Sequence, residues 1–275
     1  MTERKTRIVL ILLGSIFMAT FCLTPFAYMF ITSFSESSDF LSSQDFHFSL
    51  DNYRSVLTVR SLHFLDYLRN SLIVSGISAF LCVLIAGLAA YAITRLALPG
   101  KVFIMFFVLA VSMFPQVSMV GYLFKFMAGI GWTDTYRSLI FPYIAWILPL
   151  SLWILVSYFA QIPRDLDKAA LIDGATHLQI LRKIILPIAL PGFLSCFLLA
   201  FIFAFNEFIF ALVLTTTHHA RTIPVGIALF QGLHGETPWG NIMAAATITT
   251  IPVVILTVIF QRHIIQGLTR GAVKS

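Results

Sequence analysis

The residue in this sequence best placed to do chemistry inside a membrane is Glu207, the one acidic side chain within its long apolar runs. Burying a carboxylate in lipid is costly, so such a residue has by default a functional or a paired role. Together with Asn206, it could line a path for a polar solute, or both side chains could form hydrogen bonds between helices. The residues alone leave both interpretations open.

Two tryptophans form a second candidate group. Trp146 and Trp153 are seven residues apart, and this spacing places both rings on one face of a helix. Sugars stack on aromatic rings, but aromatic side chains in membrane helices also commonly face lipid or the interface. We therefore take Trp146 and Trp153, with Asn206 and Glu207, as candidates for a solute path.

The sequence lacks the common catalytic patterns. It contains no G-x-x-x-x-G-K-[ST] phosphate loop, no H-E-x-x-H, no G-x-S-x-G and no redox cysteine pair. His218, His219 and His234 occur near one another, but their spacing is not typical of a metal site. We expect no catalytic residue, no metal and no cofactor bound by this chain, and hence a protein that is not an enzyme.

Composition sets the fold class. Of the 275 residues, 59% are hydrophobic and 11% are charged, which is far more apolar than a soluble protein. The basic residues are scattered rather than clustered, so nucleic acid is not an expected partner. Crossing a bilayer takes about 20 helical residues. Six apolar runs reach that length, and they predict an all-α protein with six transmembrane helices: Ile8–Phe34, Leu72–Thr94, Val102–Phe124, Leu139–Ala160, Ile188–Thr215 and Asn241–Gln261.

The distribution of Lys and Arg predicts the orientation. Cytoplasmic loops carry an excess of these residues when loops are short. Six spans place both termini on one side, and a cytoplasmic position for them puts most of the 18 basic residues there: Arg4, Lys5, Arg7, Arg95, Lys101, Arg164, Lys168, Arg182, Lys183, Arg262, Arg270 and Lys274. We therefore expect cytoplasmic termini. Two outer segments, 35–70 and 216–240, are polar; the first could be a solvated cap or a docking site for a partner.

The segment Gln161–Pro187 connects the fourth and fifth spans and is too polar to cross the bilayer. Pro163 and the acids after it suit the first turn of a helix, and Gly174 suits its C-terminal end. Thr176 to Gln179 fits a capping box, so a second helix should begin there and end at Pro187. A capped helix pair favours docking of a partner, although an amphipathic linker on the membrane surface is the alternative.

This segment resembles the cytoplasmic signature of the membrane subunits of binding-protein-dependent ABC importers, which reads E-A-A, three residues, G, nine residues, I-x-L-P. The matching positions are Ala169, Ala170, Gly174, Ile184, Leu186 and Pro187. Lys168 stands where the signature has Glu, and Asp167 supplies an acid one position earlier. The resemblance implies that Asp167, Lys168 and Asp173, with the six matching residues, couple the chain to an ATPase.

The resemblance continues beyond this signature, toward the C-terminus. Phe205 to Phe208 is similar to the aromatic-Asn-acid stretch of carbohydrate permeases, and the ending resembles that of maltose and trehalose-type permeases, whose tail reaches the ATPase. This implies a second set of ATPase contacts: Gly267, Leu268, Thr269, Gly271 and Lys274.

The expectation is thus one transmembrane domain over residues 1–275, of the type I ABC importer fold, with a coupling loop at 161–187 and a cytoplasmic tail at 262–275. The resemblance implies a permease subunit in a prokaryotic inner membrane that translocates a disaccharide or oligosaccharide such as trehalose or maltose. Its partners would be a second homologous permease, an ATPase dimer that binds ATP and Mg, an extracytoplasmic sugar-binding protein and the lipid bilayer. A permease for another polar solute, such as glycerol phosphate, or a partner-independent secondary carrier is the alternative.

Overall fold

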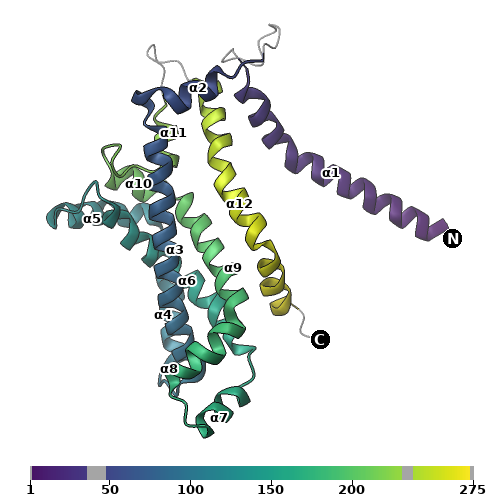
Figure 1. Cartoon of the computed structure of the whole chain (residues 1–275), viewed down its shortest axis with the longest axis vertical. Helices are drawn as coiled ribbons and strands as arrows, with labels where there is room; N and C mark the ends of the chain where they lie inside the picture. The colour runs from purple at the N-terminus through teal and green to yellow at the C-terminus, as the bar shows by residue number, and fades with distance from the viewer. Residues whose placement is uncertain (1, 36–47, 231–237, 273–275) are drawn as a thin grey trace. The chain divides into compact units, whose positions relative to one another are not determined.

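The computed structural model describes residues 2–35, 48–230 and 238–272 (Figure 1). Every regular element within these ranges is helical, and one antiparallel bridge joins Ser35 to Phe48. The chain divides into two compact units, Met1–Leu65 with Gly226–Ile251 and Asp66–Val225 with Pro252–Ser275. Parts of both predicted outer loops, including His234, lie outside the described residues.

The first unit holds α1 (Thr2–Ser33), α2 (Asp51–Thr58), the short helix η1 (Arg60–Leu62) and the first half of α12 (Trp239–Ala272). Hydrogen bonds tie α2 to the end of α1, because the Asn52 amide donates to the carbonyls of Ser33 and Ser35 at 3.1 and 2.8 Å. The start of α12 also approaches closely. A Cβ on Gly240 would lie 2.5 Å from the Asn52 amide nitrogen, so a larger residue there would displace the amide from its hydrogen bonds.

Three helices make the core of the second unit: α3 (Phe64–Arg95), α6 (Tyr136–Ala160) and α9 (Leu186–Phe205). Small residues allow them to pack closely, as is common between membrane helices. Gly87 of α3 lies against the ring of Phe193, and Gly192 of α9 lies against the ring of Tyr158. The fully buried residues of these helices include small and large side chains: Cys82, Ala86, Ala90, Leu139, Leu155, Ala189 and Cys196.

Candidate membrane spans agree with the predicted number. Five helices are long and apolar enough to cross a bilayer, and α4 (Lys101–Ser112) with α5 (Gln116–Gly129) makes a sixth if that bent pair counts as one span. The prediction of one continuous helix over Val102–Phe124 is wrong, because the two helices meet at 90°. Pro115 lies at the break; it has no N–H to continue the helix, and it disfavours helical backbone in the residue before it.

The predicted fifth span, Ile188–Thr215, is also interrupted. Helix α9 ends at Phe205, and a separate short helix, α10 (Ile209–Leu214), follows. Glu207 therefore lies in the connection between two helices rather than within a continuous one.

The chain then continues through α11 (Ile223–Ala228) to α12. The second half of α12 belongs to the second unit, within which the rings of Phe260 and Phe197 meet edge to face. Helix α12 continues to Ala272, so most of the predicted tail is helical.

Candidate functional site: the helix pair at residues 161–187

The first helix of the predicted pair is α7 (Asp165–Ile172). Asp165 and Asp167 occupy its first turn, where negative charge is favourable. Gly174 follows the helix with a φ of +79°. Two backbone hydrogen bonds close the end, from Gly174 N to Leu171 O and from Ala175 N to Ala170 O, which is the Schellman pattern. The glycine turn is confirmed.

The second helix begins as expected. Helix α8 (His177–Ile180) has a capping box in which Thr176 N donates to the Gln179 side chain at 2.8 Å and Gln179 N donates to the Thr176 hydroxyl at 3.4 Å. Both donors would otherwise lack a partner at a helix start.

The prediction that this helix ends at Pro187 is wrong. A π-helical turn, Leu181–Ile185, joins α8 directly to α9, and Leu186 N donates to Leu181 O five residues earlier. A π-helical turn changes the hydrogen-bond pattern from i→i−4 to i→i−5. The helix can then continue through Pro187, which has no N–H to donate. Pro187 consequently occupies the first turn of α9, and α8 runs on through the π-helical turn into the fifth candidate span.

The two faces of the pair differ in burial. Ala170 of α7 is buried, as are Ile180 and Ile185 further along. The outer face exposes apolar side chains instead: Leu166, Leu171, Ile172 and Leu178, with Ile172 86% exposed. The predicted contact residues Ala169, Lys168, Asp173 and Pro187 are exposed as well, whereas Ile184 and Leu186 are half-buried. Of the two alanines in the signature, only Ala169 is free to meet another surface.

Asp167 points into the protein. One of its carboxylate oxygens lies 2.9 Å from a guanidinium nitrogen of Arg95, the last residue of α3. The same arginine donates to the carbonyls of Phe159 and Ile162 at 3.0 and 2.8 Å, where α6 ends. A guanidinium that makes one ion pair and two hydrogen bonds to two elements holds them in a defined position. Arg95 thus fixes α7 to the ends of α3 and α6.

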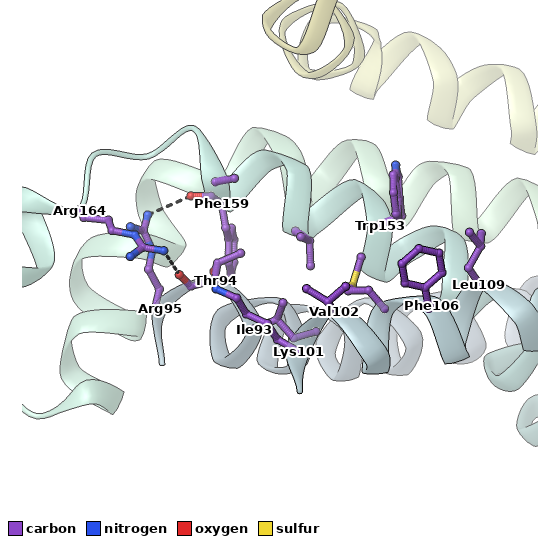
Figure 2. A pocket seen from close by; sticks show the side chains of 13 residues that line it. Ile93, Thr94, Arg95, Lys101, Val102, Phe106, Leu109, Trp153, Phe159 and Arg164 are labelled. Atoms are coloured by element: carbon purple, nitrogen blue, oxygen red, sulfur yellow. Dashed lines mark hydrogen bonds between the residues drawn. The ribbon is translucent and has the colours of Figure 1, made fainter. Parts of the chain in front are cut away.

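Two further hydrogen bonds secure the pair, which Figure 1 places at one end of α3, α6 and α9. Arg164 donates to Thr94 O at 3.0 Å (Figure 2), and the Tyr91 hydroxyl donates to His177 O at 3.1 Å. These anchors, Arg95 included, were not predicted from the sequence. The one available signal was a basic residue at the end of an apolar run, and it does not reveal a partner 72 positions away.

The predicted solute-path residues, Trp146, Trp153, Asn206 and Glu207, lie outside the helix pair in the sequence. The structure brings only some of them near one another. Glu207 is 7% exposed, and its carboxylate accepts hydrogen bonds from Phe210 N at 2.8 Å and Ala211 N at 3.1 Å. It therefore caps α10, which supports the interpretation that Glu207 is structural. The Phe210 ring in turn meets Trp146 edge to face.

The other members are more open. Trp153 is 53% exposed and Asn206 is exposed, donating to Ile202 O. Both tryptophans line a pocket of about 380 Å³ beside α4. A role of these residues in solute passage stays a prediction.

The residues predicted to contact the ATPase from the C-terminal tail are described only by their backbone or lie outside the described residues. Gly267, Leu268, Thr269 and Gly271 belong to α12, and only their backbone is described. Lys274 lies outside the described residues.

Residues 83–270 match the family of binding-protein-dependent transport system inner membrane components, a range that includes the helix pair and all of α6 and α9. This chain is a member of that family. As an inner membrane component it is a transport protein of the membrane and not an enzyme.

Two curated relatives are similar over most of their lengths. The trehalose/maltose transport system permease protein MalG of Thermococcus litoralis is 53% identical over 276 residues, covering 100% of this chain and 99% of the relative. The trehalose transport system permease protein SugB of Mycobacterium tuberculosis is 43% identical, covering 82% of each.

A solved structure supports the fold assignment. It is a crystal structure of a bacterial ABC transporter involved in the import of the acidic polysaccharide alginate. The TM-score is 0.78 at 22% identity, with 95% of this chain and 97% of the other covered. The inner membrane component described here therefore has the type I ABC importer fold.

Proposed function

We propose that this chain is the permease subunit of an ATP-driven importer for trehalose, maltose or a related saccharide. The supporting observation is its 53% identity, over its whole length, to a trehalose/maltose permease. A permease for glycerol phosphate or another solute is less well supported, and membership of a binding-protein-dependent family disfavours a carrier that works alone.

The importer would contain partners that supply what this chain lacks. They are a second homologous permease, a dimer of ATPase subunits that bind ATP and Mg, and an extracytoplasmic sugar-binding protein. Both termini of this chain would lie in the cytoplasm, as its basic residues predict.

The outer face of α7 is the proposed contact with the ATPase. Its exposed Leu166, Leu171 and Ile172 form an apolar surface on a polar loop, the kind of surface that marks a protein interface. Asp167 would act indirectly, by holding α7 against Arg95. A movement of the ATPase would then pass from α7 to the ends of α3 and α6, and through the continuous helix at Pro187 into α9. The C-terminal residues Gly267, Leu268, Thr269, Gly271 and Lys274 would add the second contact.

Co-purification and uptake test this function together. The intact importer should retain its ATPase on purification and should accumulate labelled trehalose or maltose only with ATP and the binding protein. Ile172→Asp, on the exposed face of α7, should release the ATPase because a charge replaces an apolar contact.

Leu57→Asp in α2 is the matched control, since Leu57 is also exposed and apolar. Equal ATPase retention by both variants would refute the proposed contact. Uptake of an amino acid or phosphate ester in place of any saccharide would refute the substrate class and leave the contact standing.

A further inference from the structure

A pocket of about 500 Å³ lies beside the anchored ends of α3 and α6, with α4 as its third wall. Figure 2 shows Arg95 and Arg164 at one end and Trp153, Phe106 and Leu109 at the other. Lys101, at the first position of α4, lies between these ends. The pocket is thus basic at one end and apolar along the rest.

The basic side chains of the pocket are not all paired with acidic ones. Arg95 is matched by Asp167. Arg164 uses one of its five N–H donors on Thr94 O, and Lys101 is exposed. Within the part of the chain that the structure describes, neither Lys101 nor Arg164 has an acidic side chain within 4.0 Å. Lys101 and Arg164 therefore line the pocket as two cations without an acidic partner among the described residues.

The apolar end continues along α4. A second pocket, of about 380 Å³, shares Met105, Leu109 and Trp153 with the first and reaches Ser112, the last residue of the helix. The 12 residues of α4 rise about 18 Å, which is close to the roughly 15 Å depth of one leaflet of a bilayer. The groove between α4 and α6 therefore has the length of a lipid tail.

We propose that this groove binds an anionic phospholipid, with the headgroup phosphate between Lys101 and Arg164 and one acyl chain along α4. Charge complementarity selects this occupant. A free anion would leave the apolar groove empty, and a zwitterionic lipid would bring its own cation to the two basic residues. The surrounding bilayer supplies the ligand, and the positive-inside prediction places the basic end at the cytoplasmic leaflet, where anionic lipids attract such residues.

A lipid bound in this groove would affect the helix pair, because Arg164 also donates a hydrogen bond to Thr94 O. A phosphate at this arginine would steady the junction of α3 with the segment that leads into α7. The lipid would then be a structural ligand of the coupling region.

Native mass spectrometry of the purified importer tests the proposal. Phosphatidylglycerol and phosphatidylcholine with identical chains would be titrated in parallel, with inorganic phosphate as a third probe. Each basic residue near a membrane surface contributes roughly 1 kcal/mol, so Lys101→Gln with Arg164→Gln should weaken phosphatidylglycerol binding about 30-fold. Lys125→Gln with Arg54→Gln removes two charges from exposed positions outside the groove and should change binding little.

Equal binding of the two lipids, equal loss in both double variants, or competition by inorganic phosphate would each overturn the proposal. A second measurement does not depend on the folding of those variants. A photoreactive benzoylphenylalanine at Phe106, which is 68% exposed, should form adducts with lipid in native membranes. Adducts with another protein chain would show instead that a partner helix fills the groove.

Discussion

The guanidinium of Arg95 lies 2.9 Å from the carboxylate of Asp167, and only 4% of the arginine side chain is exposed. Arg95 is the last residue of the candidate membrane span α3 and Asp167 lies in the first turn of α7, so the ion pair joins that span to the helix pair. Its burial makes it sensitive to the loss of either member.

Replacement of Asp167 by Asn should loosen α7 and lower uptake. Removing one member of a buried pair costs about 3 kcal/mol, because the remaining charge is left without compensation. Hydrogen exchange should show faster exchange of the α7 amides. Asp165→Asn is the control, since its pair with Lys168 is exposed and worth less than about 1 kcal/mol. Similar exchange in the two variants would contradict the role given to Arg95.

Gly174→Ala should destabilise the turn between α7 and α8. The φ of +79° is a left-handed conformation that costs a residue with a Cβ roughly 1–2 kcal/mol. Space is not the cause, because no atom lies within 4 Å of a Cβ built there. Gly121→Ala in α5 has the same free space but a helical backbone, and it should be neutral or slightly stabilising. Thermal unfolding of the two variants measures the difference.

Gly192→Ala should destabilise the packing of α6 on α9 by about 1–3 kcal/mol. The added Cβ would lie 2.7 Å from the Tyr158 ring, which is buried and has little room to move. A second change, Tyr158→Leu, should recover part of this loss by removing the ring. Gly76→Ala in α3, where no atom lies within 4 Å, provides the control in the same thermal unfolding assay. A melting temperature of Gly192→Ala equal to that of Gly76→Ala would show that the contact yields without cost.

The loop at Thr216 and Thr217 should loosen in acid. Asp134 accepts hydrogen bonds from both backbone N–H groups at 2.9 Å. Burial by itself raises the pKa of Asp134, but the hydrogen bonds from Thr217 and Thr216 and the charge of Arg221 outweigh it and lower the pKa below the usual 3.8. The stabilisation is therefore fully present above that value and is lost as pH falls through the lower pKa of the folded protein.

Hydrogen exchange of the Thr216 and Thr217 amides measures this loss. In Asp134→Asn, the Thr216 and Thr217 amides should exchange faster at neutral pH. Their exchange should then follow only the intrinsic pH dependence of an unprotected amide, with no added loss of protection in acid. Asparagine tolerates the positive φ of 59° at this position, so backbone strain does not confound the comparison. Unchanged protection in Asp134→Asn would mean that other contacts hold the loop.

The sequence predicted local features well where the signal was local. The glycine turn at Gly174 and the capping box at Thr176 follow from residues within one helical turn of each other, and both are present. The prediction for Pro187 failed because a proline acts as a helix end only if the hydrogen-bond register stays regular. The π-helical turn before it changes that register.

Sequence by itself determined the number of apolar runs, the capped helix pair and the family, because hydrophobic length and short-range spacing are written along the chain. Tertiary structure decided which faces meet. Ala169 and Ala170 are adjacent and chemically identical, yet only Ala170 is buried. The partner of Asp167 is decided in the same way, since the close approach of Arg95 depends on how α3, α6 and α7 pack and on no pattern within any one of them.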